Sequence, residues 1–170
     1  MGETGAEHVE DDAGEPNASE HRAIVQFLEA STQLHDALNR MLLEEHKLSL
    51  FDVLLLDLLA KSDGGSARIG ELAESLTLLL SRVSQQVSRL ELQGLVRRSA
   101  SRSDRRGVIA TITRDGEARL KRAMRTYALA VRTYYLNPLS RQQMTALGDS
   151  CRRISTGLKP SGPEKRSNTD

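Results

Sequence analysis

The spacing of apolar residues predicts a chain built mainly from helices. Between positions 22 and 46 apolar residues recur three or four positions apart, which is the pattern of one face of an amphipathic helix. They are Ile24, Phe27, Leu28, Leu34, Leu38, Met41 and Leu42. A second helix is expected over Leu50–Ala60 with Ser49 as its N-cap. That segment is apolar nearly all round, which predicts a buried helix.

The middle of the chain predicts a helix-turn-helix followed by a hairpin. A short helix is expected over 70–76 and another over 81–93, which ends at Gly94 because glycine accepts a positive φ. Two short strands follow at 95–99 and 108–112, the second with alternating apolar side chains. The polar, arginine-rich segment 100–107 between them is expected to form the hairpin tip.

Two more helices complete the pattern. Thr113 is expected to cap a helix that continues to about Leu136, where Asn137 and Pro138 end it. The last helix is expected over 140–158, and Ser62–Ser66 is expected to be a turn. The apolar residues of the last helix follow spacings of 3, 4, 3 and 4, as in a coiled-coil seam. They are Met144, Leu147, Cys151, Ile154 and Leu158.

These elements predict a mainly α fold of six helices with a small two- to three-stranded β-wing, a winged helix-turn-helix. The first, fifth and sixth helices are longer than one such domain needs, so their apolar stripes predict a dimer. We therefore expect one domain over 21–158. Within it, 49–112 form the winged helix-turn-helix, and 21–48 and 113–158 the dimerisation helices. Residues 1–20 and 159–170 are poor in large apolar residues and are expected to be disordered tails.

Charge is distributed unevenly along the chain. Residues 1–20 contain seven acidic residues and no lysine or arginine, whereas 81–106 contain seven arginines against Glu91 and Asp104. A local basic patch is typical of a surface that binds a polyanion. The other interpretation is a solvated helix face, but five of these arginines fall within 97–106, which does not have a helical pattern.

Other classes of function find little support in the sequence. Apolar runs such as Val53–Leu56 are far shorter than the roughly 20 residues of a membrane span. The acidic beginning of the chain does not fit a signal peptide, so a cytoplasmic location is expected. We find no nucleophile triad, P-loop or metal-ligand cluster, and we expect no enzyme activity, cofactor or metal. The single cysteine, Cys151, is expected to be a small buried hydrophobic residue.

The segment from Glu71 to Arg98, followed by Asp104 to Gly116, resembles the MarR (multiple antibiotic resistance regulator) family. The shared pattern is Leu-Ala-x-x-Leu, a turn, Ser-x-Val-Ser-x-x-Val-x-x-Leu-Glu-x-x-Gly-Leu-Val-x-Arg, an Asp-x-Arg wing tip, and Thr-x-x-Gly. The resemblance covers about residues 22–158 and implies a dimeric bacterial repressor that binds double-stranded DNA. Two departures stand out: Leu79 and Leu80 occupy a usually polar turn, and Gln85 stands where many relatives carry arginine. The two leucines are compatible with packing on a neighbour or with contact to thymine methyl groups.

The fourth helix carries the first set of expected DNA contacts. If Val83, Val87 and Leu90 face the core, the polar residues of its first turns face outward. Gln85 is expected to contact adenine, and Arg82 guanine or a phosphate. The alternative is that these residues only keep an exposed helix soluble. The full set is Ser81, Arg82, Ser84, Gln85, Gln86 and Arg89; Ser81 is also expected to cap the helix or hold a phosphate.

The hairpin carries the second set. Guanidinium groups on a hairpin tip suit the narrow minor groove, where the negative potential is strongest. The resemblance implies that Arg106 reaches this groove, and Asp104 is expected to orient it by a charge-assisted hydrogen bond. Arg97 and Arg98 are expected to contact phosphates or to be structural charges. The set proposed for DNA is Arg97, Arg102, Asp104, Arg105 and Arg106.

The resemblance suggests where an effector would bind, but not which effector. Relatives bind small molecules, such as aromatic carboxylates, between the dimer helices and the DNA-binding lobe. The matching residues would be Met41, His46, Phe51, Leu55 and Tyr127. His35 and His46 are compatible with one helix face, but their spacing is not a metal motif and they are expected to be ordinary polar residues.

The sequence thus predicts a homodimeric, sequence-specific transcriptional regulator that binds a pseudo-palindromic operator, with possible release by a small-molecule effector. The alternative is a helical dimer module that acts through protein contacts without binding DNA. Salt dependence separates the two, since several phosphate contacts make affinity fall steeply with added salt.

Overall fold

A computed structural model of the chain describes residues 14–100 and 107–158. The chain divides into two compact units, residues 1–33 and 34–170. The first helix, α1 (Ala18–His46), runs through the boundary between them. The two units are therefore described separately.

The described part of the first unit is the beginning of α1. The helix begins at Ala18, so the expectation that residues 18–20 belong to a disordered tail is wrong. The reason is local: the Asn17 side chain accepts hydrogen bonds from the Ser19 and Glu20 amides, and the Glu20 carboxylate accepts one from the Asn17 amide at 2.8 Å. This reciprocal cap satisfies amides that a helix start otherwise leaves unpaired. Ile24 and Leu28 are exposed on this part of the helix.

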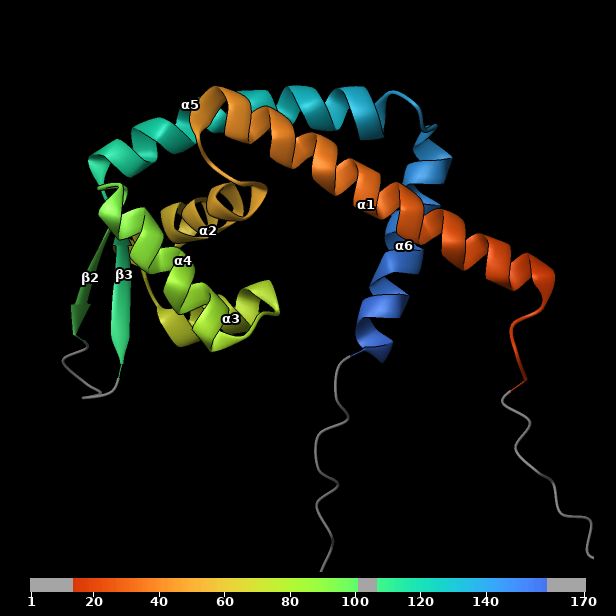
Figure 1. Cartoon of the computed structure of the whole chain (residues 1–170), viewed down its shortest axis with the longest axis horizontal. Helices are drawn as coiled ribbons and strands as arrows, with labels where there is room; N and C mark the ends of the chain where they lie inside the picture. The colour runs from red at the N-terminus through yellow and green to blue at the C-terminus, as the bar shows by residue number, and fades with distance from the viewer. Residues whose placement is uncertain (1–13, 101–106, 159–170) are drawn as a thin grey trace, which may run out of the picture. The chain divides into compact units, whose positions relative to one another are not determined.

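The second unit contains the other elements (Figure 1). In chain order they are α2 (Leu50–Lys61), a 3-10 turn (Asp63–Gly65), β1 (Ser66–Arg68), α3 (Ile69–Leu76), α4 (Leu80–Leu92), β2 (Val96–Ala100), β3 (Val108–Ile112), α5 (Arg114–Val131), a π-helical turn (Arg132–Leu136) and α6 (Arg141–Gly157). Within the described residues, the six helices and the small sheet confirm the predicted fold class.

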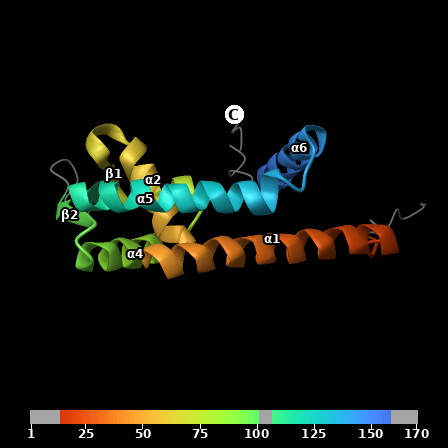
Figure 2. The ribbon, with the colours of Figure 1, turned by 90° about the horizontal axis from the view of Figure 1, so that it is seen from above.

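The three strands form one antiparallel sheet in the order β1-β3-β2. Val96 lies opposite Ile112 in the hairpin, and Ser66 lies opposite Thr111 on the other side of β3. The hydroxyl groups of Ser66 and Thr111 are 2.9 Å apart and share a hydrogen bond. β1 was not predicted: only its first residue fell in the expected turn Ser62–Ser66, because three residues are too few to show strand periodicity. Figure 2 shows the start of α5 beside this sheet.

The core of the second unit lies around α2. Val53, Leu55, Leu56 and Leu59 are almost completely buried, which confirms that this nearly all-apolar helix is an internal one. The buried face of α4 packs into the same core through Val83, Val87 and Leu90, as predicted. With this face fixed inward, Ser81 and Gln85 on the opposite side of α4 point away from the core.

The helix ends confirm the predicted caps at Ser49 and Thr113, add one at Ser140 and correct one. Ser49, Thr113 and Ser140 cap α2, α5 and α6 through their side-chain oxygens. The N-cap of α4 is Leu79, however, and it makes no side-chain cap hydrogen bond. The prediction that Ser81 caps α4 is therefore wrong, because the helix begins one residue before it. Gly94, with a φ of 72°, ends the segment after α4.

The last helix leaves its apolar face largely open. None of the described residues of α6 is buried. Met144, Leu147 and Cys151 are half-buried, whereas Ile154 and Leu158 are exposed. The predicted seam is thus the least exposed side of the helix, and Cys151 is less buried than expected.

Candidate nucleic-acid interface

The outer face of α4 presents polar side chains from its first two turns. Ser81, Arg82 and Gln85 are exposed, and Ser84 is half-buried. Ser81 and Gln85 lie one turn apart and opposite the buried valines, so both point away from the core. The structure therefore brings together four of the predicted contacts on one accessible helix face.

Arg82 also contacts a residue expected to serve a different role. Its guanidinium carbon lies 5.6 Å from the centre of the Phe51 ring. At this distance a cation is attracted to the face of an aromatic ring. A predicted DNA contact and a predicted effector residue are thus neighbours, and Phe51 holds Arg82 beside the N-terminus of α2.

A buried carboxylate ties α4 to α2. Asp52 is fully buried, and its side chain accepts hydrogen bonds from the amide and the hydroxyl group of Ser49, both at 2.7 Å. It also accepts one from the Gln86 side-chain amide, and one from Arg89 at 2.5 Å. The four donors compensate the cost of removing this charge from water.

This arrangement corrects the expected orientation of Gln86 and gives the exposed Arg89 a partner inside the protein. Gln86 was placed on the outer face of α4, but it is half-buried and directed at Asp52. Arg89 is half exposed, with its guanidinium group on the same carboxylate. Asp52 itself was missed as a site residue. Two signals mark it: the Ser-x-x-Asp spacing of a capping box, and a lone acid near the start of an apolar helix.

The same helix start is also held by α1. The Asn39 side-chain oxygen accepts a hydrogen bond from the Leu50 amide at 2.9 Å. Asn39 lies in the part of α1 that belongs to the second unit. The N-terminus of α2 is therefore a junction where a side chain from α1 and side chains from α4 meet.

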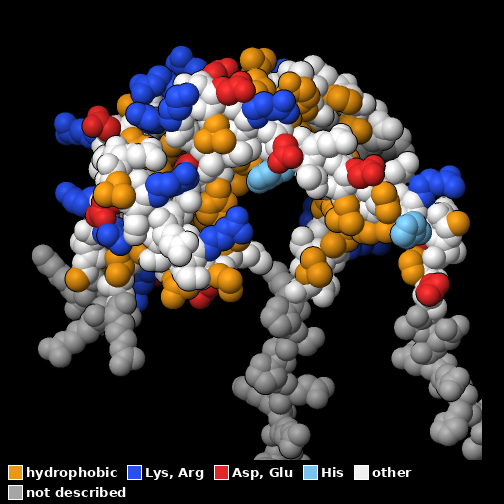
Figure 3. Space-filling model, in the orientation of Figure 1, with side chains coloured by type: hydrophobic (Ala, Val, Ile, Leu, Met, Phe, Trp, Pro, Cys, Tyr) orange, Lys and Arg blue, Asp and Glu red, His pale blue; other side chains and the backbone are white. Residues whose placement is uncertain are grey.

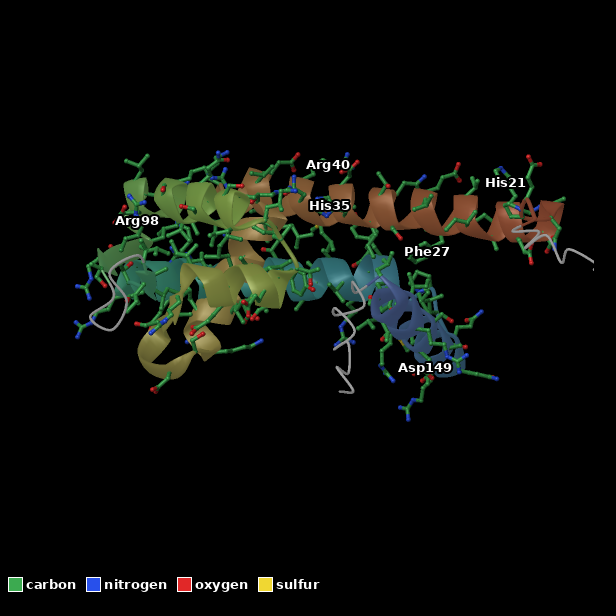
Figure 4. All side chains as sticks on the ribbon, turned by 90° about the horizontal axis from the view of Figure 1, so that it is seen from below. His21, Phe27, His35, Arg40, Arg98 and Asp149 are labelled. Carbon is green, nitrogen blue, oxygen red and sulfur yellow. The ribbon has the colours of Figure 1, made fainter. Side chains whose placement is uncertain are left out.

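The hairpin is fixed to α4 by an ion pair. Arg98 of β2 donates from its Nε to Glu91 at 2.6 Å and from its Nη1 to Ser88 at 2.9 Å. Its backbone amide donates to the other Glu91 oxygen at 3.0 Å. This backbone hydrogen bond, followed by the side-chain one, lowers the pKa of Glu91. Arg98, labelled in Figure 4, therefore joins β2 to α4 through this ion pair.

The basic side chains around this region remain accessible. Figure 3 shows Lys and Arg side chains gathered over α4 and the first part of α5. Arg97 is exposed on β2. Four predicted wing residues lie outside the described part of the chain: Arg102, Asp104, Arg105 and Arg106.

Of the residues suggested to bind an effector, some lie in the core and others lie nearer the surface. Leu55 has no exposed surface and belongs to the core, so its predicted contact with a ligand is not supported. Met41 and Tyr127 are partly buried against the same core. His46 lies at the end of α1, where its Nε2 is 2.8 Å from the Thr126 hydroxyl oxygen on α5.

A small hollow adjoins His46. Its volume is about 270 Å³, and the Thr126 hydroxyl that contacts His46 donates to Glu45 at 2.6 Å. Arg119 donates to the His46 backbone carbonyl at 3.2 Å. The hollow is lined by Glu45, His46, Lys47, Arg119 and Arg122. Three of these side chains are cationic, which favours an anionic group.

Within residues 14–100 and 107–158 there is no cluster of three or more residues able to hold a metal ion. His35 is exposed on α1 (Figure 4), whereas His46 is engaged with Thr126. In the same described residues, no helix is long and apolar enough to cross a membrane.

Comparison with known proteins gives the family. The model of the MarR family matches residues 48–108. Sco3205, a MarR family transcriptional regulator from Streptomyces coelicolor solved in complex with DNA, is 34% identical, with a TM-score of 0.85 over 89% of this chain and 94% of that chain. AbsC, another MarR family regulator from the same organism, is 28% identical, with a TM-score of 0.82 over 88% of this chain and 100% of its own.

A search of curated proteins gives no match. The identity with Sco3205 over nearly the whole length of both chains, together with the matching family model, decides the assignment. The chain belongs to the MarR family of winged-helix transcriptional regulators.

Proposed function

We propose that this protein is a homodimeric repressor that binds a pseudo-palindromic DNA operator through α4 and the wing. The observation that carries the proposal is the outer face of α4, where Ser81, Arg82 and Gln85 are exposed while the opposite face is locked in the core. In the helix-turn-helix docking mode, the N-terminal part of such a helix enters the major groove.

The base contacts follow from the side-chain chemistry. The Gln85 amide can pair with adenine N6 and N7, and the Arg82 guanidinium group with guanine O6 and N7 or with a phosphate. The amides at the start of α4 lack a side-chain cap, so a phosphate there would be held by the helix dipole and the Ser81 hydroxyl. Sco3205, the relative with 34% identity, has been solved with DNA, which supports this use of the fold.

The dimer is supported by the open face of α6. A helix of 17 residues with none buried in the protomer gains little from packing within its own chain. A second copy would cover Ile154 and Leu158 and set two α4 helices about one turn of DNA apart. Replacing Ile154 with Arg should convert dimers to monomers in analytical ultracentrifugation. A dimer that persists in Ile154→Arg at micromolar concentration would contradict this assignment.

An effector site is proposed at the hollow beside His46. Lys47, Arg119 and Arg122 surround it, so a small carboxylate is the suitable ligand class. Benzoate at millimolar concentration should raise the melting temperature of the wild type and lower its DNA affinity, and the Arg122→Ala variant should respond less. Equal responses of the wild type and Arg122→Ala to benzoate would contradict the proposed site.

DNA binding itself is tested by fluorescence anisotropy on a duplex selected from a random library. We expect affinity to fall steeply between 50 and 200 mM salt, by about 10³-fold or more if six or more phosphates are contacted. Arg106→Ala should weaken binding, since the wing contact would be lost. A module that acts only through protein contacts would enrich no duplex and show no such salt dependence.

A further inference from the structure

Two exposed leucines stand at the tip of the helix that is proposed to enter the major groove. Leu79 is 75% exposed and Leu80 is 57% exposed, although both are large apolar residues. Thr77, with a φ of 53°, turns the chain after α3, and Leu78 packs against the core. The next two residues then form the N-cap and the first residue of α4, so they project from its leading end.

Leu80 lines two hollows. One is lined by Leu78, Leu79, Leu80 and Arg82 together with residues of α3. The other is lined by Leu80 and Ser84 together with α3 and the start of β3. Leu80 thus lines both hollows and directly precedes Ser81 and Arg82, which are exposed on α4.

The lining of these hollows offers a phosphate no net positive charge. Glu74 lines both of them, with Arg82 in the first and with Glu71 and Arg68 in the one toward β3. The carboxylates thus offset the arginines, and the leucine side chains donate no hydrogen bond to a phosphate. The edges of the bases suit Leu79 and Leu80 better, because they carry little net charge and one of them has an apolar group. That group is the 5-methyl of thymine, which is exposed in the major groove.

We propose that Leu79 and Leu80 read thymine through its 5-methyl group and thereby specify T over C next to the bases contacted by Arg82 and Gln85. The inference rests on the proposed DNA-binding function and names the base that these residues select. Burying one methyl group contributes roughly fourfold in affinity, so two equivalent contacts in a dimer contribute about 15-fold.

The test compares thymine with uracil, which lacks only the 5-methyl group. A duplex selected by the wild type from a random library is synthesised with thymidine, or with deoxyuridine at one symmetric pair of positions at a time. At the contacted pair, we expect the wild type to bind the deoxyuridine duplex about 15-fold more weakly. The Leu79→Ala or Leu80→Ala variant, or both, should bind the two duplexes equally. Since both side chains are exposed, neither substitution should unfold the protein.

Leu92→Ala is the matched control. Leu92 is 89% exposed at the other end of α4, so its replacement should leave the preference for thymine unchanged. Equal binding of thymine and uracil duplexes by the wild type at every position would overturn the inference while leaving DNA binding intact. Failure to enrich any duplex would instead reject the proposed function. A shift to lower mass in Leu79→Ala and Leu80→Ala, with the thymine preference retained, would assign the leucines to self-association and overturn the inference.

Discussion

The Arg89 guanidinium group of α4 lies 2.5 Å from the Asp52 carboxylate at the start of α2. The acid is fully buried, whereas the arginine side chain is 47% exposed. The pair therefore lies at the edge of the core, where one partner faces the protein and the other faces solvent. Its position fixes α4 relative to α2 and leaves the outer face of α4 free for DNA.

Removing either partner should have unequal effects on stability. Asp52→Ala removes half of the α2 capping box and leaves Gln86 and Arg89 without their acceptor, so a loss of about 3 kcal/mol in unfolding free energy is expected. Arg89→Ala should cost about 1 kcal/mol, because its pair is screened by solvent and Asp52 keeps three other donors. Urea unfolding monitored by circular dichroism measures both.

The control for this comparison is another ion pair of the same unit. Lys61 and Asp57 form an exposed i,i+4 pair at 2.6 Å on α2. Asp57→Ala should cost about 0.5 kcal/mol or less. If Asp52→Ala proves no more costly than Asp57→Ala, the buried carboxylate does not hold the two helices together.

The Glu91 carboxylate, at the base of the wing, should make the stability of the fold depend on pH. Its pKa is lowered, mainly by the Arg98 backbone amide and then by the Arg98 side chain. A carboxylate whose pKa is lower in the folded state than in the unfolded state stabilises the fold when the pH is above the unfolded-state pKa. That stabilisation is lost as the pH falls through the folded-state pKa. Arg98→Ala should raise the pKa of Glu91, but not fully to its ordinary value, since the backbone hydrogen bond remains.

The measurement is an NMR titration of the Glu91 side-chain carboxyl carbon between pH 2 and pH 6. The exposed Glu44 serves as a reference within the same spectra. An unchanged titration midpoint for Glu91 in Arg98→Ala would show that the side-chain pair contributes nothing. A midpoint that returns fully to the ordinary value would show that the backbone hydrogen bond does not form.

Replacing Gly116 is also expected to lower the free energy of unfolding. It lies in the first turn of α5, and a Cβ atom there would overlap the Leu95 carbonyl oxygen. That oxygen accepts a hydrogen bond from the Thr113 amide at 3.0 Å, so it cannot move without disturbing the start of α5. Gly116→Ala should therefore lower the free energy of unfolding by about 2–3 kcal/mol.

Gly148 of α6 is the control. A Cβ atom at Gly148 would have no atom within 4 Å, so Gly148→Ala should stabilise the protein by about 0.5–1 kcal/mol. Thermal unfolding compares the two; equal effects would exclude the overlap.

Much of the fold could be predicted because its signals are local. The inward stripe of α4, the cap at Ser49 and the glycine that ends α4 each depend on residues a few positions apart. The start of α1 at Ala18 was missed because acidic composition outweighed the Asn17 cap. β1 was missed because its pairing with Thr111 involves residues 45 positions apart.

The candidate site was predicted in part for the same reason. Helical periodicity placed Gln85 correctly on the outer face of α4. It also suggested an outward Gln86, because periodicity reports angles around one helix and carries no information about Asp52, which lies 34 residues earlier. Long-range polar partners of this kind require the three-dimensional arrangement.

Gln85 and Gln86 together give the most direct test of the recognition surface. They are adjacent and chemically identical, but Gln85 is exposed whereas Gln86 donates to buried Asp52. Gln85→Ala should relax the preference at one adenine by about 1–3 kcal/mol and leave the unfolding free energy nearly unchanged. Gln86→Ala should do the reverse, costing about 1–2 kcal/mol in stability while the base preference at that adenine persists. Competition binding with duplexes altered at each position, measured alongside urea unfolding, separates the two effects. Loss of base preference in Gln86→Ala with full preference in Gln85→Ala would mean that the recognition helix is rotated from the orientation described.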